Sequence, residues 1–161
     1  MSEKQVNIKQ ILPKIASYCA YQDRCRQEVI NKLETFGLES KQIEEVVLWL
    51  IEEKYLDEKR FAASFVRGKF NRNKWGRYKI RQALKQKQVQ EDAVRYGLAE
   101  IDGEQYFEVL KQLVRQKLGR SKETEMFVLK YKCIQYLSGK GFEGDLIQDA
   151  FQEVWNSDQE V

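Results

Sequence analysis

Lysine and arginine are concentrated in one part of this chain. Residues 59–90 contain 11 of them and no aspartate or glutamate, although the 161 residues together carry 28 basic and 25 acidic side chains. A dense group of cations attracts phosphates and releases their counterions on contact, whatever the order of the nucleotides. We name residues 59–90 the basic stretch, and its composition predicts that the protein binds a polyanion. The alternative is that acidic residues elsewhere in the fold neutralise it.

The acidic residues form a cluster of their own. Residues 34–58 contain eight of them against two lysines, Lys41 and Lys54. Two interpretations remain open. The cluster orients the protein on a partner that is basic in one place and rich in phosphate in another, or it pairs with the basic stretch inside the fold.

The composition predicts an all-α protein. Hydrophobic residues make up 42% and charged residues 33% of the chain, which is typical of one or two small soluble domains. One proline and nine glycines leave the strong helix formers almost uninterrupted. The first residues are polar and no apolar run is long enough to cross a bilayer, so we expect no membrane segment and a cytoplasmic location.

Residue types that catalyse reactions or bind metals are scarce. The chain has no histidine, and its three cysteines lack CxxC spacing, which excludes the usual zinc sites and predicts reduced thiols. It also lacks a glycine-rich phosphate loop. We therefore expect no enzyme, no catalytic residue, no metal and no cofactor.

The chain contains three copies of one pattern, a helix, a short link and a second helix. The leucines that close the first helix of each pair are Leu33, Leu84 and Leu137, at spacings of 51 and 53 residues. Gly37 and Gly141 follow four residues later in two copies, as is typical of a left-handed residue that ends a helix. Gln88 takes this position in the middle copy, where we expect it to cost up to about 1 kcal/mol.

An amphipathic stretch precedes each pair, so each copy has three helices. These stretches are residues 11–21, 61–70 and 106–118. A unit of this size has little core of its own, so we expect tandem repeats that bury one another's faces in an elongated, curved stack. The predicted repeats are residues 1–57, 58–102 and 103–161.

Two polar residues are placed to begin helices. Asp57 precedes Glu58 and the apolar face that starts at Phe61, so it is a candidate N-cap. Ser40 is placed to cap the helix that follows it, which should end near Lys54.

We predict that phosphates bind the basic stretch and one position in each of the other copies. Arg26, Arg77 and Lys130 each lie seven residues before the aligned leucine, which favours equivalent contacts, although a tolerant surface position explains them too. Four bases assigned to the second helix of the middle copy recur at spacings of three and four residues and so line one side of it. They are Lys74, Arg77, Arg81 and Lys85. The complete set of predicted binding residues is Arg26, Arg67, Lys69, Arg72, Lys74, Arg77, Lys79, Arg81, Lys85, Lys87 and Lys130.

Three segments, taken in order, resemble the RecX family. They are Tyr55-Leu56-Asp57-Glu58-Lys59-Arg60-Phe61-Ala62, Trp75-Gly76-Arg77-Tyr78-Lys79-Ile80 and Gly139-Lys140-Gly141-Phe142. The resemblance covers roughly residues 11–155. It implies three tandem three-helix repeats and a monomer that inserts into the groove of the RecA recombinase filament on single-stranded DNA. It also implies suppression of ATP hydrolysis, strand exchange and co-protease activity, and so control of recombination and the SOS response.

The sequence departs from the family pattern at two places. Lys54 stands where the family often has glycine, and Gln88 stands where a glycine often follows the middle leucine. Neither position is one of the predicted binding residues.

A helix-turn-helix transcription regulator is the alternative function. Residues 76–87 predict a basic second helix after a short turn, as in such DNA readers. A reading helix should expose Asn, Gln or Ser to base edges, whereas we expect this one to present mostly Lys and Arg, which bind phosphates.

Overall fold

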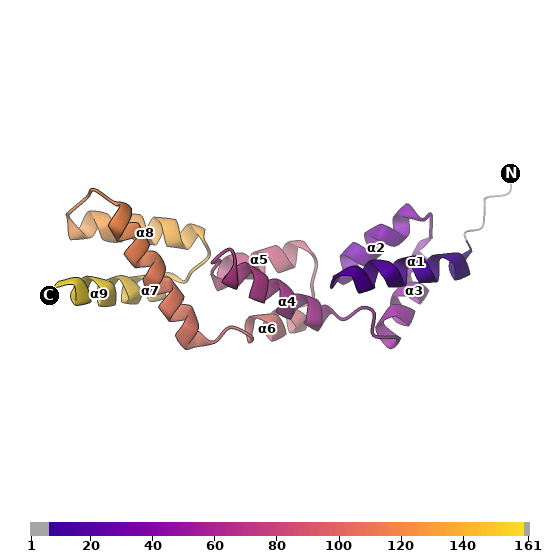
Figure 1. Ribbon diagram of the computed structural model, residues 1–161. Helices are drawn as coiled ribbons and strands as arrows, with labels where there is room; N and C mark the ends of the chain where they lie inside the picture. The colour runs from indigo at the N-terminus through magenta and orange to yellow at the C-terminus, as the bar shows by residue number, and fades with distance from the viewer. Residues whose placement is uncertain (1–6, 160–161) are drawn as a thin grey trace. The chain divides into compact units, whose positions relative to one another are not determined.

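The computed structural model describes residues 7–159, and within that range it contains nine α-helices and no strand (Figure 1). The all-α prediction is therefore confirmed for the described residues. The helices are α1 (Ile8–Tyr21), α2 (Arg26–Thr35), α3 (Ser40–Glu52), α4 (Glu58–Asn71), α5 (Arg77–Gln86), α6 (Glu91–Leu98), α7 (Gly103–Arg120), α8 (Met126–Gly139) and α9 (Gly144–Gln159).

Left-handed residues end the middle helices, as predicted. Gly37, Gln88 and Gly141 have φ angles of 84°, 60° and 97° after α2, α5 and α8. In two of these turns the aligned leucine's carbonyl accepts a backbone bond from the apolar residue five positions on, at 3.2 Å for Leu84 and 3.1 Å for Leu137. This closing bond satisfies a carbonyl that the helix end leaves without a partner.

The predicted helix starts are correct in one case and wrong in the other. The Asp57 carboxylate accepts a bond from the Arg60 N–H at 3.0 Å and so caps α4. Ser40 is not a cap but the first residue of α3, and Glu39 precedes the helix. The backbone N–H of Glu39 donates to the Gln42 side chain at 3.0 Å, so Gln42, and not Ser40, pairs with the backbone at the start of this helix. The same helix ends at Glu52, and Lys54 follows in a left-handed conformation with φ of 64°.

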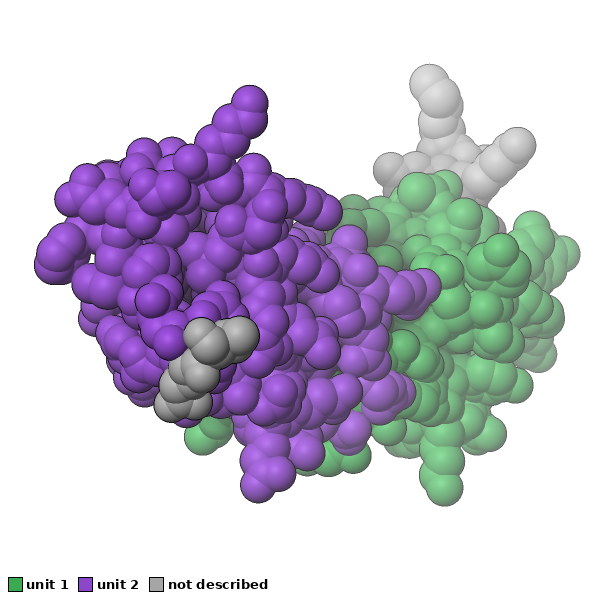
Figure 2. Space-filling model, turned by 60° about the vertical axis from the view of Figure 1, so that its left-hand side comes forward, with its two compact units in different colours: residues 1–65, 84–97 green, residues 66–83, 98–161 purple. Residues whose placement is uncertain are grey.

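The chain divides into two compact units, which Figure 2 colours separately. Unit 1 is residues 1–65 and 84–97, and unit 2 is residues 66–83 and 98–161. Each unit therefore combines an outer helix triplet with part of the middle one.

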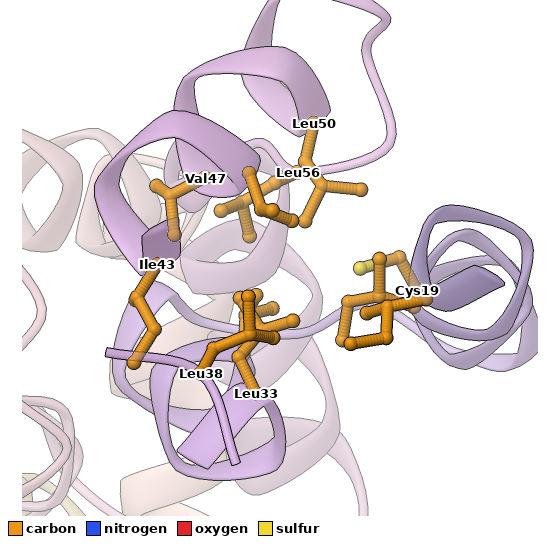
Figure 3. Close-up of a cluster of buried hydrophobic side chains, with 11 residues drawn as sticks. Cys19, Leu33, Leu38, Ile43, Val47, Leu50 and Leu56 are labelled. Carbon is orange, nitrogen blue, oxygen red and sulfur yellow. The ribbon is translucent and has the colours of Figure 1, made fainter. Parts of the chain in front are cut away.

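Unit 1 contains an apolar core made by α1, α2 and α3. Its buried members include Ile15, Leu33 and Leu50, all fully inaccessible to solvent. Figure 3 shows side chains from these helices converging with Leu38 and Leu56, which follow α2 and α3. The apolar spacing of the three helices thus accounts for their packing.

Unit 2 has its core between α7, α8 and α9, which pack against one another. Leu110, Leu137 and Phe151 supply one fully buried side chain from each helix. The end of α4 joins this core through Phe70, whose ring stacks on Tyr106 at 5.7 Å between centroids.

None of the helices in residues 7–159 combines the length and the apolar character needed to cross a membrane.

Candidate nucleic-acid interface

In unit 2 the turn before α5 is hydrogen-bonded to the turn after α8, and Gly76 and Gly141 lie at this contact. The Gly76 N–H donates to the Lys140 carbonyl at 2.7 Å, and the Tyr78 N–H donates to the Gly141 carbonyl at 3.0 Å. A Cβ atom at Gly76 would lie 2.3 Å from the Gly141 carbonyl carbon, so no side chain fits there. The second and third segments that carry the family resemblance are therefore partners in the fold.

Arg77, the first residue of α5, is held by two side chains of unit 2. Its guanidinium pairs with the Glu143 carboxylate at 2.7 Å and lies 4.0 Å from the centre of the Tyr106 ring. The backbone N–H of Arg77 donates to the Tyr106 hydroxyl at 3.1 Å, and this hydroxyl in turn donates to the Glu143 carboxylate. We name these three residues the Arg77 cluster.

The side chains of the Arg77 cluster are partly or fully buried. Tyr106 is 1% exposed, and burial together with its bond to Glu143 raises the pKa of its hydroxyl above the ordinary value. The side chain of Arg77 is 31% exposed, and that of Glu143 only 17%. Since a carboxylate already neutralises the guanidinium, Arg77 has a structural role that its sequence position did not reveal.

Two lysines flank an aromatic ring next to this turn. The ammonium groups of Lys69 and Lys79 lie 4.7 and 4.5 Å from the centre of the Trp75 ring. The neighbouring Tyr78 is 62% exposed. Cations beside accessible aromatic rings are the combination that binds phosphates and stacks bases of single strands. We name Lys69, Trp75 and Lys79 the Trp75 cluster.

The other predicted residues of unit 2 differ in their surroundings. Arg72 is exposed, and its guanidinium lies across Gly68 one turn earlier. Arg67 forms an exposed ion pair with Glu100 at 3.4 Å, a contact that contributes little to stability. Arg81 is half-buried on α5.

Lys74 is not on α5, contrary to our prediction. It lies in the turn after α4 with φ of 55°, and its N–H donates to the Phe70 carbonyl at 3.2 Å. The reason is that α4 ends at Asn71 and α5 begins only at Arg77, so the spacing of the bases extended back before the start of α5.

Arg26 and Arg77 begin α2 and α5, whereas Lys130 is the fifth residue of α8. The helix α8 thus starts one turn earlier relative to its leucine, and the equivalence of the three contacts stays a prediction. In unit 1 the Arg26 N–H donates to Glu58 at 3.1 Å. Arg26 also lines a cavity of about 550 Å³ that has both basic and acidic walls, with Arg60 and Asp92 among them.

The last two predicted residues belong to unit 1. Lys85 is exposed on α5. Lys87 is half-buried, and its carbonyl accepts a bond from the Cys25 thiol at 3.9 Å.

The exposed residues of α5 differ from our expectation. Beside Lys85 they are Tyr78, Gln82 and Gln86, whereas Arg77, Lys79 and Arg81 are half-buried. The prediction that this helix presents mostly Lys and Arg to solvent is therefore wrong. The long basic side chains lie partly against the fold instead of extending into solvent.

The three cysteines are free and buried. Burial is the main cause that raises the pKa of the Cys25 thiol to about 11, which makes it a poor nucleophile. Across residues 7–159 no three His, Cys, Asp or Glu side chains are grouped so that they could hold a metal ion.

The described helices and these clusters define a helical protein that carries cations beside aromatic rings. Two family descriptions match it, "RecX, second three-helix domain" over residues 57–98 and "RecX, third three-helix domain" over residues 104–151. Together these cover more than half of the chain. The chain belongs to the RecX family.

Individual relatives agree with this assignment. Proteins named "Regulatory protein RecX" from Bacillus mycoides and Clostridium botulinum are each 31% identical, over 86% and 83% of this chain. The chain spans 51% and 63% of their lengths, less than two thirds in both cases. The crystal structure of RecX from Lactobacillus salivarius superimposes with a TM-score of 0.86 at 26% identity, over 91% of this chain and 96% of the other. A crystal structure of regulatory protein RecX gives 0.74, also at 26% identity, over 92% and 81% of the two chains.

Proposed function

We propose that this RecX-family regulator inhibits the RecA recombinase by binding in the groove of the filament that RecA forms on single-stranded DNA. The bound protein suppresses ATP hydrolysis, strand exchange and co-protease activity, and so limits recombination and the SOS response. It acts as a cytoplasmic monomer, by binding and not by catalysis.

The observation that carries this proposal is the basic stretch, with 11 bases and no acid among 32 residues. Exposed Arg72 and Lys85 are suited to phosphates, and the Trp75 cluster adds cations beside an aromatic ring. Phosphate contacts position a protein without reading bases, so we expect no preference for a DNA sequence. The filament supplies the specificity, and the flanking repeats contact adjacent recombinase subunits and obstruct their motion.

The test is DNA-dependent ATP hydrolysis by RecA filaments at several salt concentrations. The variant Arg72→Glu/Lys85→Glu should need roughly 25-fold more protein for equal inhibition, with a weaker salt dependence, because each of the two lost phosphate contacts reduces affinity about fivefold at 0.1 M salt. The variant Lys9→Glu/Lys14→Glu is the matched control, because it makes the same charge change at exposed positions of α1. Equal inhibition by both variants at every salt concentration would refute the role of the basic stretch.

One observation favours a second candidate, a reader of double-stranded DNA. Gln82 and Gln86 are exposed one turn apart on α5, and glutamine is a residue type that recognises adenine in the major groove. A mobility-shift competition between random and selected duplexes distinguishes the two functions. Only a protein that recognises bases in double-stranded DNA binds the selected duplexes in preference to the random ones.

A further inference from the structure

A second cationic hollow lies in the third repeat, away from the basic stretch in sequence and entirely within unit 2. It has a volume of about 240 Å³. Lys117 and Arg120 line it from the last turn of α7, and Lys132 and Tyr136 line it from α8. The described lining contains three cations and no acid, so the hollow has a positive potential.

The surrounding sequence strengthens this charge. Residues 112–142 contain seven bases and two acids, Glu123 and Glu125. Favourable interaction with a helix C-terminus accounts for Lys117 and Arg120 in the last turn of α7. It does not account for Lys132, which comes from another helix and adds its charge to the same hollow. An anion in the hollow would relieve this repulsion.

Tyr136 gives the hollow an aromatic wall. Its side chain is 44% exposed, and the Lys117 ammonium lies 4.8 Å from its ring centre. Accessible aromatic rings stack bases, and adjacent cations hold the phosphates that connect them.

From this arrangement we infer that the hollow binds single-stranded nucleic acid, with a phosphate at Lys117, Arg120 and Lys132 and a base against Tyr136. The inference deepens the proposed function and rests on it in taking single-stranded DNA as the ligand. It gives the third repeat a contact with the strand itself, in addition to the contact made by the basic stretch.

The test measures binding of a fluorescent oligo(dT) to the full chain by anisotropy at several salt concentrations, without recombinase. The variant is Lys117→Gln/Arg120→Gln/Lys132→Gln, and the matched control is Lys9→Gln/Lys14→Gln/Lys41→Gln, which removes three exposed charges elsewhere. The variant should lower the slope of log Kd against log salt by about 0.7 and weaken binding about fivefold at 0.1 M salt, since one single-strand phosphate contact contributes about 0.7 to the slope. The control should bind like the original chain.

A second measurement locates the base. Ultraviolet irradiation with an iodouracil oligonucleotide should cross-link Tyr136, as mass spectrometry of the peptides would show. Binding by the triple variant equal to that of its control, with no cross-link at Tyr136, overturns the inference. So does a triple variant that inhibits the filament poorly but binds oligo(dT) normally, because the hollow then contacts protein. If the original chain inhibits the filament but does not bind oligo(dT), the inference fails while the proposed function stands.

Discussion

Arg77 and Glu143 form an ion pair of 2.7 Å although 66 positions separate them in the chain. Tyr106 bonds to both, so α7 also takes part in the contact. Arg77, which the sequence predicts as a phosphate-binding residue, therefore also links α5 to the turn before α9.

The first prediction concerns the energy of the ion pair between Arg77 and Glu143. In a double-mutant cycle of Arg77→Met and Glu143→Gln, unfolding by urea should give a coupling energy of about 1–2 kcal/mol, because the pair is partly buried and charge-assisted. The cycle of Arg67→Met and Glu100→Gln is the control, and it should give less than about 0.5 kcal/mol because that pair is exposed. Equal coupling in the two cycles would contradict the structural role of Arg77.

The second prediction concerns the contact between glycines. Gly76→Ala should lower the free energy of unfolding by about 3 kcal/mol or prevent folding, because the new methyl group overlaps backbone atoms that cannot move aside. Gly119→Ala is the matched change, since nothing lies within 4 Å of a Cβ there, and it should leave stability unchanged or raise it by up to about 1 kcal/mol. Circular dichroism during thermal unfolding measures both. A Gly76→Ala protein as stable as the original would show that the two turns are not in close contact.

The third prediction concerns the left-handed residue in the middle repeat. Gln88→Gly should raise the free energy of unfolding by up to about 1 kcal/mol, because glycine adopts a φ of 60° without strain. Gln82→Gly places the same substitution inside α5 and should lower it by about 1 kcal/mol. Opposite signs in urea unfolding are the expected result. Destabilisation by both changes would contradict a left-handed Gln88.

The fourth prediction is a loss of stability in alkali. Burial raises the Cys25 pKa from 9.0 to about 11, so between these values the unfolded chain loses a proton that the folded chain keeps. The free energy of unfolding is therefore undiminished by this group below pH 9, and it falls as the pH rises toward about 11. Urea unfolding at pH 8 and pH 10.5 measures the fall, which should be smaller in Cys25→Ala. The same fall in both proteins would exclude Cys25 as a cause.

Local patterns predicted much of the fold. Apolar spacing located the helices, and the recurring leucine and glycine located the left-handed turns at Gly37 and Gly141. Spacing failed where a helix began later than its pattern, as at Lys74, or where a neighbouring residue took the capping position, as at Ser40. The division into three repeats by residue range stays a prediction.

The candidate site was less accessible to sequence reasoning, because charge alone does not reveal what a side chain contacts. The basic stretch identified the cations, but the Glu143 partner of Arg77 comes from a distant turn that only the tertiary fold brings near. Glutamines exposed on α5 were missed for a similar reason, since exposure depends on which face of the helix packs inward.

The most direct test of the central claim is co-sedimentation of the chain with RecA, single-stranded DNA and a nonhydrolysable nucleotide. The account predicts that the chain sediments with the filament, and that Arg72→Glu/Lys85→Glu does so far less than Lys9→Glu/Lys14→Glu. A chain that stays in the supernatant while RecA filaments sediment would contradict it.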